Sequence, residues 1–216
     1  MSSVYAILVD PSVAGRLAIK EIEVPKAGLA QAIVQFEAIS LNRGEVKNAM
    51  IAEAGWRPGW DLAGTIIQQA VDGTGPKVGC RVVGLVGGGA WAEQVAVPMS
   101  LLAEIPGSVS FAQAAALPTA GLTALRALEK GGLLMNRRVL ITGSTGGVGI
   151  FTHQLARRTG TYVVGMARTP QREAFVREAG ADEVVIGEDI SVASTYGPYH
   201  LILTSCDLAH LIVKIL

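Results

Sequence analysis

Hydrophobic and polar positions follow two different periods along this chain. In the first half, residues 34–38 and 93–97 alternate apolar with polar side chains, which is the period of a half-buried strand. Residues 62–68 and 81–86 are further candidate strands, and turns rich in Asp, Gly and Pro separate these segments. Short strands at this spacing predict an antiparallel barrel or sandwich.

Two helices are predicted to follow this β-rich region. Ser110 and Gln113 have the spacing of a capping box, and they begin an Ala-rich helix that stops near Pro118. A second helix covers residues 119–130 and ends at a pair of glycines. We therefore expect two domains, residues 1–118 and residues 119–216.

The second half has the pattern of an α/β protein. Its predicted strands are residues 139–142, 162–167, 183–186 and 201–203. One helix is predicted to open at Val148 and to end at Gly160, and another starts at Pro170 and closes at Gly180. Strands that alternate with helices of about 10–15 residues are typical of a doubly wound parallel sheet.

The turn between the first of these strands and its helix carries three spaced glycines, Gly143-x-x-Gly146-x-x-Gly149. Unpaired backbone N–H groups and the dipole at a helix N-terminus favour an anion, and glycines allow a pyrophosphate to come close. The alternative is a Gly-rich turn with a structural role. We predict a nucleotide site, and its expected residues are Gly143, Ser144, Thr145, Gly146, Gly147, Val148 and Gly149.

The same turn also matches the short-chain dehydrogenases, whose pattern is Thr-Gly-x-x-x-Gly-x-Gly. In that family the turn lies near the N-terminus, and a Tyr-x-x-x-Lys pair follows it. Here the whole β-rich region precedes the turn, and a Lys is absent four residues after each later tyrosine, namely Tyr162, Tyr196 and Tyr199. This family is therefore set aside.

The choice of nucleotide depends on the end of the second predicted strand of this half. NAD enzymes usually carry Asp or Glu there to bind the ribose hydroxyls. This chain has Arg168, with Arg172 one helical turn later, and guanidinium groups can bind a 2′-phosphate. The alternative is that both arginines only solvate the start of a helix. We predict NADP(H) as the cofactor.

The composition excludes several classes of protein. The 18 basic and 18 acidic side chains balance, so nothing points to nucleic acid. No apolar run reaches the length of a membrane span, and the N-terminus does not resemble a signal peptide. Cys80 and Cys206 are too few for a disulfide scaffold. We expect a cytoplasmic protein that acts on a small molecule.

Several segments in order resemble the medium-chain dehydrogenases/reductases, and within them the zinc-free quinone oxidoreductases and enoyl reductases. The matching segments are residues 41–45, 58–64, 89–93, 114–118 and 121–124, together with the Gly-rich turn. The resemblance implies a chaperonin-10-like β-barrel followed by a Rossmann sheet. It also implies that NADPH passes hydride to a quinone or an α,β-unsaturated carbonyl.

The same resemblance suggests catalytic residues. It assigns Asn42 and Arg43 to the substrate and the nicotinamide ribose, where they would polarise a carbonyl, and Thr123 to the nicotinamide region. The structural alternatives are a polar turn for Asn42 and Arg43 and an intrahelical hydrogen bond for Thr123. Trp56 and Trp60 could line the substrate pocket or cover the end of the barrel.

No metal is expected. Zinc-dependent relatives have a Cys near Asn42 and a Gly-His-Glu where this chain has Gly59-Trp60-Asp61, and the chain has no cluster of four cysteines. Cys206 and His210 lie four residues apart, which we interpret as incidental. His153 follows the Gly-rich turn and is expected to be partly packed.

The C-terminal region departs from the family. After the fourth predicted strand of the second half, the chain lacks the usual Gly-Gly turn, and it stops at Leu216. We therefore expect an incomplete Rossmann domain in a C-terminally truncated chain. Family members are usually homodimers, through a strand edge that belongs to the region missing here. The alternative function is a catalytically inactive nucleotide-binding fragment with a binding or regulatory role.

Overall fold

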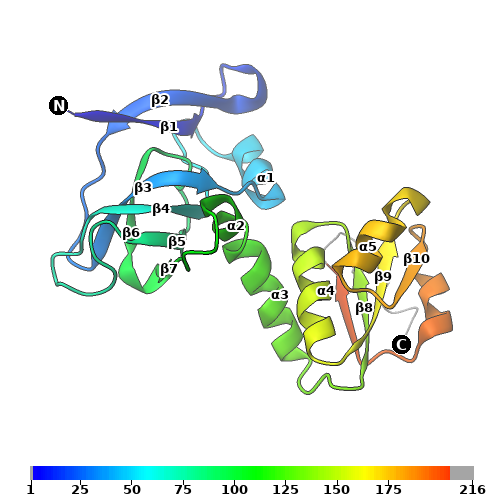
Figure 1. Cartoon of the computed structure of the whole chain (residues 1–216). Helices are drawn as coiled ribbons and strands as arrows, with labels where there is room; N and C mark the ends of the chain where they lie inside the picture. The colour runs from blue at the N-terminus through cyan, green and yellow to red at the C-terminus, as the bar shows by residue number, and fades with distance from the viewer. Residues whose placement is uncertain (1, 205–216) are drawn as a thin grey trace. The chain divides into compact units, whose positions relative to one another are not determined.

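The chain folds into two compact units in a computed structural model, which describes residues 2–204 (Figure 1). The units are Met1–Thr119 and Ala120–Leu216. No helix within residues 2–204 has both the length and the apolar character that crossing a bilayer requires.

The first unit consists mainly of short strands, as the alternating pattern predicted. Its elements are β1 (Ser3–Val9), η1 (Ala14–Arg16), β2 (Leu17–Glu23), β3 (Gln31–Ile39), α1 (Arg43–Ile51), β4 (Asp61–Gln68), β5 (Arg81–Leu85), β6 (Gln94–Pro98), η2 (Met99–Leu101), β7 (Leu102–Glu104) and α2 (Phe111–Ala115). Within the described residues, five strands form one sheet in the order β6-β3-β4-β5-β7, and β1 pairs with β2 in a hairpin. All of these pairings are antiparallel.

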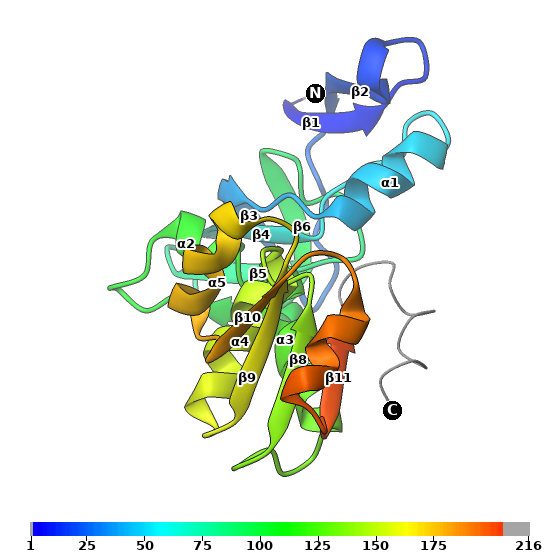
Figure 2. The same cartoon turned by 90° about the vertical axis from the view of Figure 1, so that its right-hand side faces the viewer.

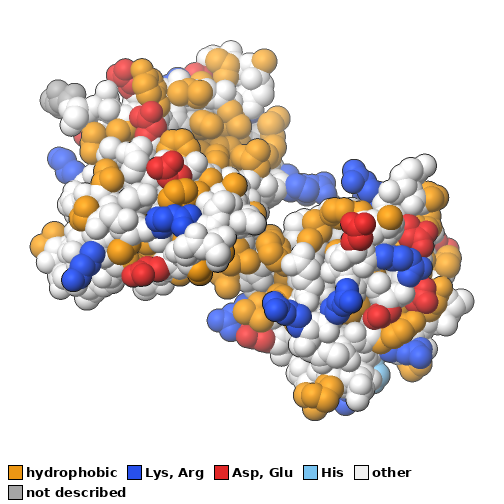
Figure 3. Space-filling model, in the orientation of Figure 1, with side chains coloured by type: hydrophobic (Ala, Val, Ile, Leu, Met, Phe, Trp, Pro, Cys, Tyr) orange, Lys and Arg blue, Asp and Glu red, His pale blue; other side chains and the backbone are white. Residues whose placement is uncertain are grey.

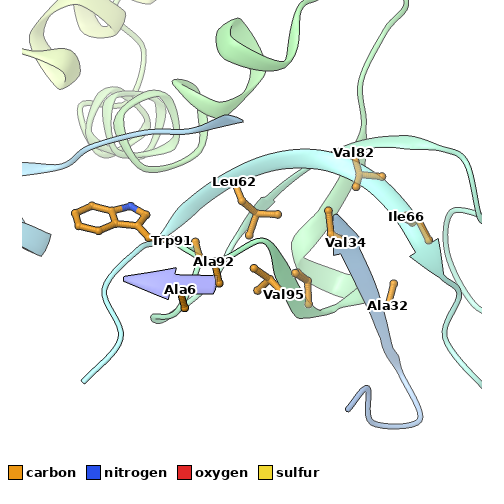
Figure 4. Packing of buried hydrophobic residues seen from close by; sticks show 11 residues of the cluster. Ala6, Ala32, Val34, Leu62, Ile66, Val82, Trp91, Ala92 and Val95 are labelled. Atoms are coloured by element: carbon orange, nitrogen blue, oxygen red, sulfur yellow. The ribbon is translucent and has the colours of Figure 1, made fainter. Parts of the chain in front are cut away.

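Alternate residues of this sheet face two different cores. One face carries Val34, Leu62 and Val82, which are fully buried and pack in a cluster that Figure 4 shows from close by. Ala63 and Val83 come from intervening positions and pack instead against buried alanines of α2. The period of two therefore specifies which side chains reach each core. The hairpin was not predicted, because most of β2 is exposed and shows no buried alternation.

The second unit contains the alternating strands and helices. Its elements are α3 (Pro118–Lys130), whose first two residues belong to the first unit, then β8 (Arg138–Thr142), α4 (Gly147–Arg158), β9 (Tyr162–Ala167), η3 (Pro170–Arg172), α5 (Glu173–Ala179), β10 (Glu183–Ile186), η4 (Ile190–Tyr196) and β11 (Leu201–Thr204). In the described part of this unit, four parallel strands form a sheet in the order β10-β9-β8-β11 (Figure 2). The predicted strands agree with this sheet.

Helical segments cover both faces of the parallel sheet. Val139 and Ile141 of β8 pack with residues of α3 and α4, whereas Leu140 between them packs against Ile190 and Ala193 of η4. Figure 1 shows α4 and η4 on opposite sides of the strands. The doubly wound arrangement is therefore confirmed for the part of the sheet that is described.

A histidine is buried inside this unit. His153 on α4 has no exposed surface, and neither of its ring nitrogens has a hydrogen-bond partner among the described residues. The ring packs on Gly165 of β9, where a built Cβ would lie 2.8 Å from Cε1. Burial lowers the pKa of His153 to about 4, because the charged form would lose its hydration. The side chain is thus fully rather than partly packed.

This burial predicts a pH-dependent stability. In the unfolded chain, His153 binds a proton as the pH falls below its ordinary pKa of 6.5. In the folded chain, the same ring is protonated only near pH 4. The free energy of unfolding should therefore fall as the pH drops through this window, by up to about 1.4 kcal/mol per pH unit from this group. Urea unfolding at several pH values should show a shallower slope for His153→Leu. The exposed His200→Leu is the control, and equal slopes for both variants would contradict the prediction.

Candidate functional site

The Gly-rich turn joins β8 to α4 at the predicted place. Gly143 has a φ of +67°, a left-handed conformation that side chains rarely adopt. Its carbonyl oxygen accepts a hydrogen bond from the N–H of Gly146 at 3.0 Å, which closes the turn. The first glycine is therefore required by the backbone.

The last glycine of the motif is required by packing. A Cβ at Gly149 would lie 2.4 Å from the carbonyl oxygen of Gly143 and 2.8 Å from Cα of Ser144. Real Cβ atoms do not come so close to backbone, so a side chain here would push α4 away from the turn. Gly149 thus determines how closely the helix approaches the strand end.

For the two glycines between them, residues 2–204 show neither a backbone nor a packing requirement of this kind. Gly146 and Gly147 are exposed and do not have a positive φ. A built Cβ would lie 3.4 Å from the oxygen of Gly143 at one position and 3.4 Å from Cβ of Ala120 at the other, an ordinary contact distance. Gly146 is also the N-cap of α4 and has no side chain to cap the first N–H groups. The arrangement leaves the helix N-terminus open to an anion.

The other residues of the turn differ in what they can offer. Ser144 is fully buried, and its Oγ donates to the carbonyl of Ile141 at 2.8 Å and accepts from the N–H of Met166 at 3.0 Å. The side chain of Ser144 therefore links β8 and β9 through hydrogen bonds. Thr145 is exposed, whereas Val148 is partly buried and can contribute only its backbone N–H.

The two predicted arginines lie at the end of the neighbouring strand. Arg168 directly follows β9, and Arg172 is the last residue of η3; both are exposed. The Nε of Arg168 lies 3.0 Å from Oε1 of Glu188, and these side chains are 77% and 71% exposed. An ion pair this exposed contributes little to stability, so Arg168 can change partners at small cost. Glu188 was not foreseen, because it follows a different strand.

Asn42 and Arg43, the predicted catalytic residues, lie at the start of α1. Asn42 is the N-cap and Arg43 the first helical residue, which is exposed. Asn42 forms a capping box with Glu45, whose Oε2 accepts the backbone N–H of Asn42. Asn-x-x-Glu has the spacing of a helix start, and this was the signal that could have predicted α1.

Two buried carboxylates join this helix start to the next strand. Glu45 also accepts the N–H of Trp60 through Oε1, and burial raises the pKa of its carboxyl group. Asp61, equally buried, accepts Nδ2 of Asn42 at 2.9 Å. Its other oxygen accepts the backbone N–H of Thr119 at 3.0 Å and the Thr119 hydroxyl at 2.6 Å. The amide of Asn42 is thereby oriented, with one of its two N–H hydrogens committed to Asp61.

The remaining candidate residues from the sequence include Thr123, Trp60 and the possible metal ligands. Thr123 is exposed on α3. The ring of Trp60 packs against α1, since a Cβ at Gly44 would lie 2.5 Å from Cη2 of the indole. Among residues 2–204, no group of three or more His, Cys, Asp and Glu side chains could hold a metal ion. Cys206 and His210 lie outside the described residues.

Comparisons with known proteins agree with these features. Residues 28–107 match a family described as the alcohol dehydrogenase GroES-like domain. The chain is 33% identical over 181 residues to the chloroplastic quinone-oxidoreductase QR1 of Triphysaria versicolor, a match that covers 76% of this chain and 55% of that protein. It is 35% identical over 135 residues to the 2-methylene-furan-3-one reductase of Solanum lycopersicum, covering 58% of this chain and 35% of that protein.

A solved structure shows the same fold. The quinone oxidoreductase from Coxiella burnetii superposes with a TM-score of 0.83 at 29% identity, over 89% of this chain and 65% of that chain. The predicted fold class, a chaperonin-10-like domain followed by part of a Rossmann sheet, is therefore confirmed. The chain spans about half the length of the quinone oxidoreductase that it matches.

The buried network predicts a large effect of one substitution. Asp61→Asn replaces one acceptor oxygen by an amide donor, which must face either Asn42 or Thr119. The free energy of unfolding, measured in urea, should fall by about 1–3 kcal/mol. Asp72→Asn is the matched control, because Asp72 accepts the same two groups from Thr74 but is exposed. It should change stability by less than about 0.5 kcal/mol, and equal losses would contradict the network.

Proposed function

This chain belongs to the medium-chain dehydrogenase/reductase superfamily and is quinone oxidoreductase-like, and from that premise we propose that it is an NADP(H)-dependent oxidoreductase. The hydride acceptor in this proposal is a quinone or an α,β-unsaturated carbonyl, and the reaction does not use zinc. The names of the relatives support the class of reaction. Because the chain spans only part of these relatives, the activity is a proposal for this chain.

The observation that carries the proposal is the pair of exposed glycines, Gly146 and Gly147. Neither is demanded by backbone conformation or by packing among the residues that the structure describes. Their lack of side chains is accounted for if a diphosphate lies against the first turn of α4. In this interpretation, the N–H groups of Gly147 and Val148 bind the diphosphate, and Arg168 and Arg172 bind the 2′-phosphate.

The chemistry divides between the cofactor and the protein. Bound NADPH would supply a hydride from C4 of its nicotinamide ring. An acceptor that takes up this hydride would gain negative charge on its carbonyl oxygen, and the role of the protein would be to stabilise that charge. The uncommitted N–H of Asn42 and the exposed guanidinium of Arg43 would donate hydrogen bonds to that oxygen. Thr123 would contact the nicotinamide, and water would supply the proton.

Stopped-flow oxidation of NADPH by the whole chain tests the proposal, with a panel of quinones and enones as acceptors. We expect turnover with at least one acceptor, unaffected by a zinc chelator and reduced in Asn42→Ala. Binding of NADPH without oxidation by any acceptor would reject the enzymatic function and favour a nucleotide-binding fragment. Failure to bind NADPH would reject both.

Substitutions at two glycines of the turn should affect NADPH binding and protein stability differently. Gly147→Ala adds a methyl group at the first position of a helix, where alanine is favoured, so the free energy of unfolding should stay equal or rise. NADPH affinity, measured by fluorescence titration, should fall at least tenfold. Gly149→Ala should instead lower stability, because of its contact with the oxygen of Gly143.

Gly107→Ala is the matched control for both variants, because a Cβ there meets nothing within 4 Å and the φ is not positive. It should alter neither property. Normal NADPH binding by a folded Gly147→Ala protein would contradict the diphosphate site.

The preference for NADPH should depend on Arg168. Arg168→Asp removes a cation and adds a carboxylate that repels the 2′-phosphate, so the affinity for NADPH should fall much more than the affinity for NADH. Glu188→Gln should act in the opposite direction, because it releases Arg168 from its ion pair. Equal losses for both nucleotides in Arg168→Asp would contradict this assignment.

A further inference from the structure

The surface of the first unit has an open pocket whose lining contains none of the residues assigned above to catalysis or to cofactor binding. Its volume is about 480 Å³, within the range of small-molecule sites. Its walls include Pro25, Trp56, Arg57, Gly89, Val95 and Ala96. We call it the Arg57 pocket. It shares no residue with the Gly-rich turn or with the buried network around Asp61.

Backbone hydrogen bonds hold the walls of the Arg57 pocket in place. The segment after α1 pairs with the end of β1, because Val9 donates to the carbonyl of Trp56 and accepts from Gly55, both at 2.8 Å. Gly89, whose φ is +84°, donates its N–H to the carbonyl of Arg57 at 3.0 Å. Residues 95 and 96 belong to β6, which pairs with β3. The pocket is thus formed by ordered backbone on several sides.

Arg57 is an unusual lining residue because its charge has no counter-ion in the part of the chain that the structure describes. Within residues 2–204 it is the sole charged residue of the lining, and no described carboxylate pairs with it. Nη2 donates to the carbonyl of Gly89 at 3.3 Å, while the buried Nε has no partner among the described residues. Burial lowers the pKa of Arg57, but a guanidinium stays charged at neutral pH.

A purely structural role accounts poorly for this side chain. A buried donor without an acceptor is destabilising, and a cation that is half removed from water is more so unless an anion lies beside it. The single bond to Gly89 offsets a small part of that cost. The Nη groups retain N–H donors that a carboxylate can accept in pairs.

We propose that the Arg57 pocket binds an aromatic or similarly flat apolar monocarboxylate. The carboxylate would lie against the guanidinium of Arg57, and the apolar body would contact Trp56, Pro25 and Ala96. One cation in the lining matches one negative charge, so a monoanion fits better than a phosphate dianion. The apolar side chains in the same wall distinguish this site from one for small inorganic anions.

Titration of the whole chain with benzoate and phenylacetate tests the proposal, with binding followed by tryptophan fluorescence and by ¹H–¹⁵N NMR shifts. Both carboxylates should shift the amides of residues 55–57 and 88–89. The neutral isosteres benzamide and phenylacetamide, and the dianion phenyl phosphate, should bind at least tenfold more weakly. Tenfold corresponds to about 1.4 kcal/mol, which is close to the lower end of what a hydrogen bond to a charged group contributes.

Two variants change the Arg57 pocket in different ways. Arg57→Gln should weaken benzoate binding at least tenfold and abolish the preference over benzamide. Ala96→Leu keeps the charge but fills the apolar wall, and it should weaken both ligands. Lys77→Gln is the matched control, because it removes one exposed positive charge of the same unit outside the pocket. It should leave the affinity unchanged.

Several results would overturn the proposal. Equal affinity for benzoate and benzamide, shifts confined to other residues, or unchanged binding in a folded Arg57→Gln or Ala96→Leu protein would each do so. NADPH binding should be normal in both pocket variants, because the Gly-rich turn is untouched. The outcome is therefore independent of the proposed oxidoreductase function.

Discussion

The tight space around Gly149, where a Cβ would lie 2.4 Å from the carbonyl oxygen of Gly143, determines how closely α4 approaches β8 in the second unit. It allows α4 to begin immediately after β8, with its first N–H groups uncovered. Ser144, inside the same turn, bonds the backbone of both β8 and β9 through its buried hydroxyl. The end of the neighbouring strand, and with it Arg168, is thereby held beside the turn. Helix start, strand spacing and candidate phosphate ligands all depend on one tightly packed loop.

Buried carboxylates have the corresponding role in the first unit. Glu45 and Asp61 between them accept backbone N–H groups, a hydroxyl and the amide of Asn42. Like charges placed this close and away from water are costly unless each oxygen is satisfied by a donor. Here each oxygen accepts at least one hydrogen bond. The network therefore specifies one position for α1, for the start of β4 and for Thr119.

Arg168 and Arg57 differ in burial, and this difference favours different ligands for their guanidinium groups. Arg168 is exposed and has a carboxylate neighbour, so its charge is well solvated and can exchange partners. Arg57 is half-buried and has no carboxylate neighbour among the described residues, so its charge favours an external anion. We therefore propose different ligands for the same type of side chain, a phosphate for the exposed Arg168 and a carboxylate for the half-buried Arg57.

Local signals along the chain were sufficient for the parallel sheet and for its turn. Residues 139–149, the strand after Gly160 and the capping box at Ser110 each combine a strong pattern with a stop or start residue, and their elements formed as predicted. The mostly exposed β2 had no such pattern. The helix that starts at Asn42 was not predicted, although Asn42 and Glu45 have the spacing of a capping box. The failure to predict β2 has a physical reason, because an exposed strand is specified by its hairpin partner rather than by its own residues.

Contacts between residues far apart in the chain were beyond prediction from one sequence. Nothing local to Asp61 reveals that Thr119 will donate to it, and nothing local to Arg57 reveals that it will donate to the carbonyl of Gly89 and share a pocket lining with β6. Composition and periodicity follow from the interactions of neighbours along the chain, so they specify elements and short motifs. Burial, hydrogen-bond partners and the environment of a charge arise when distant segments pack, and therefore only the folded chain reveals them.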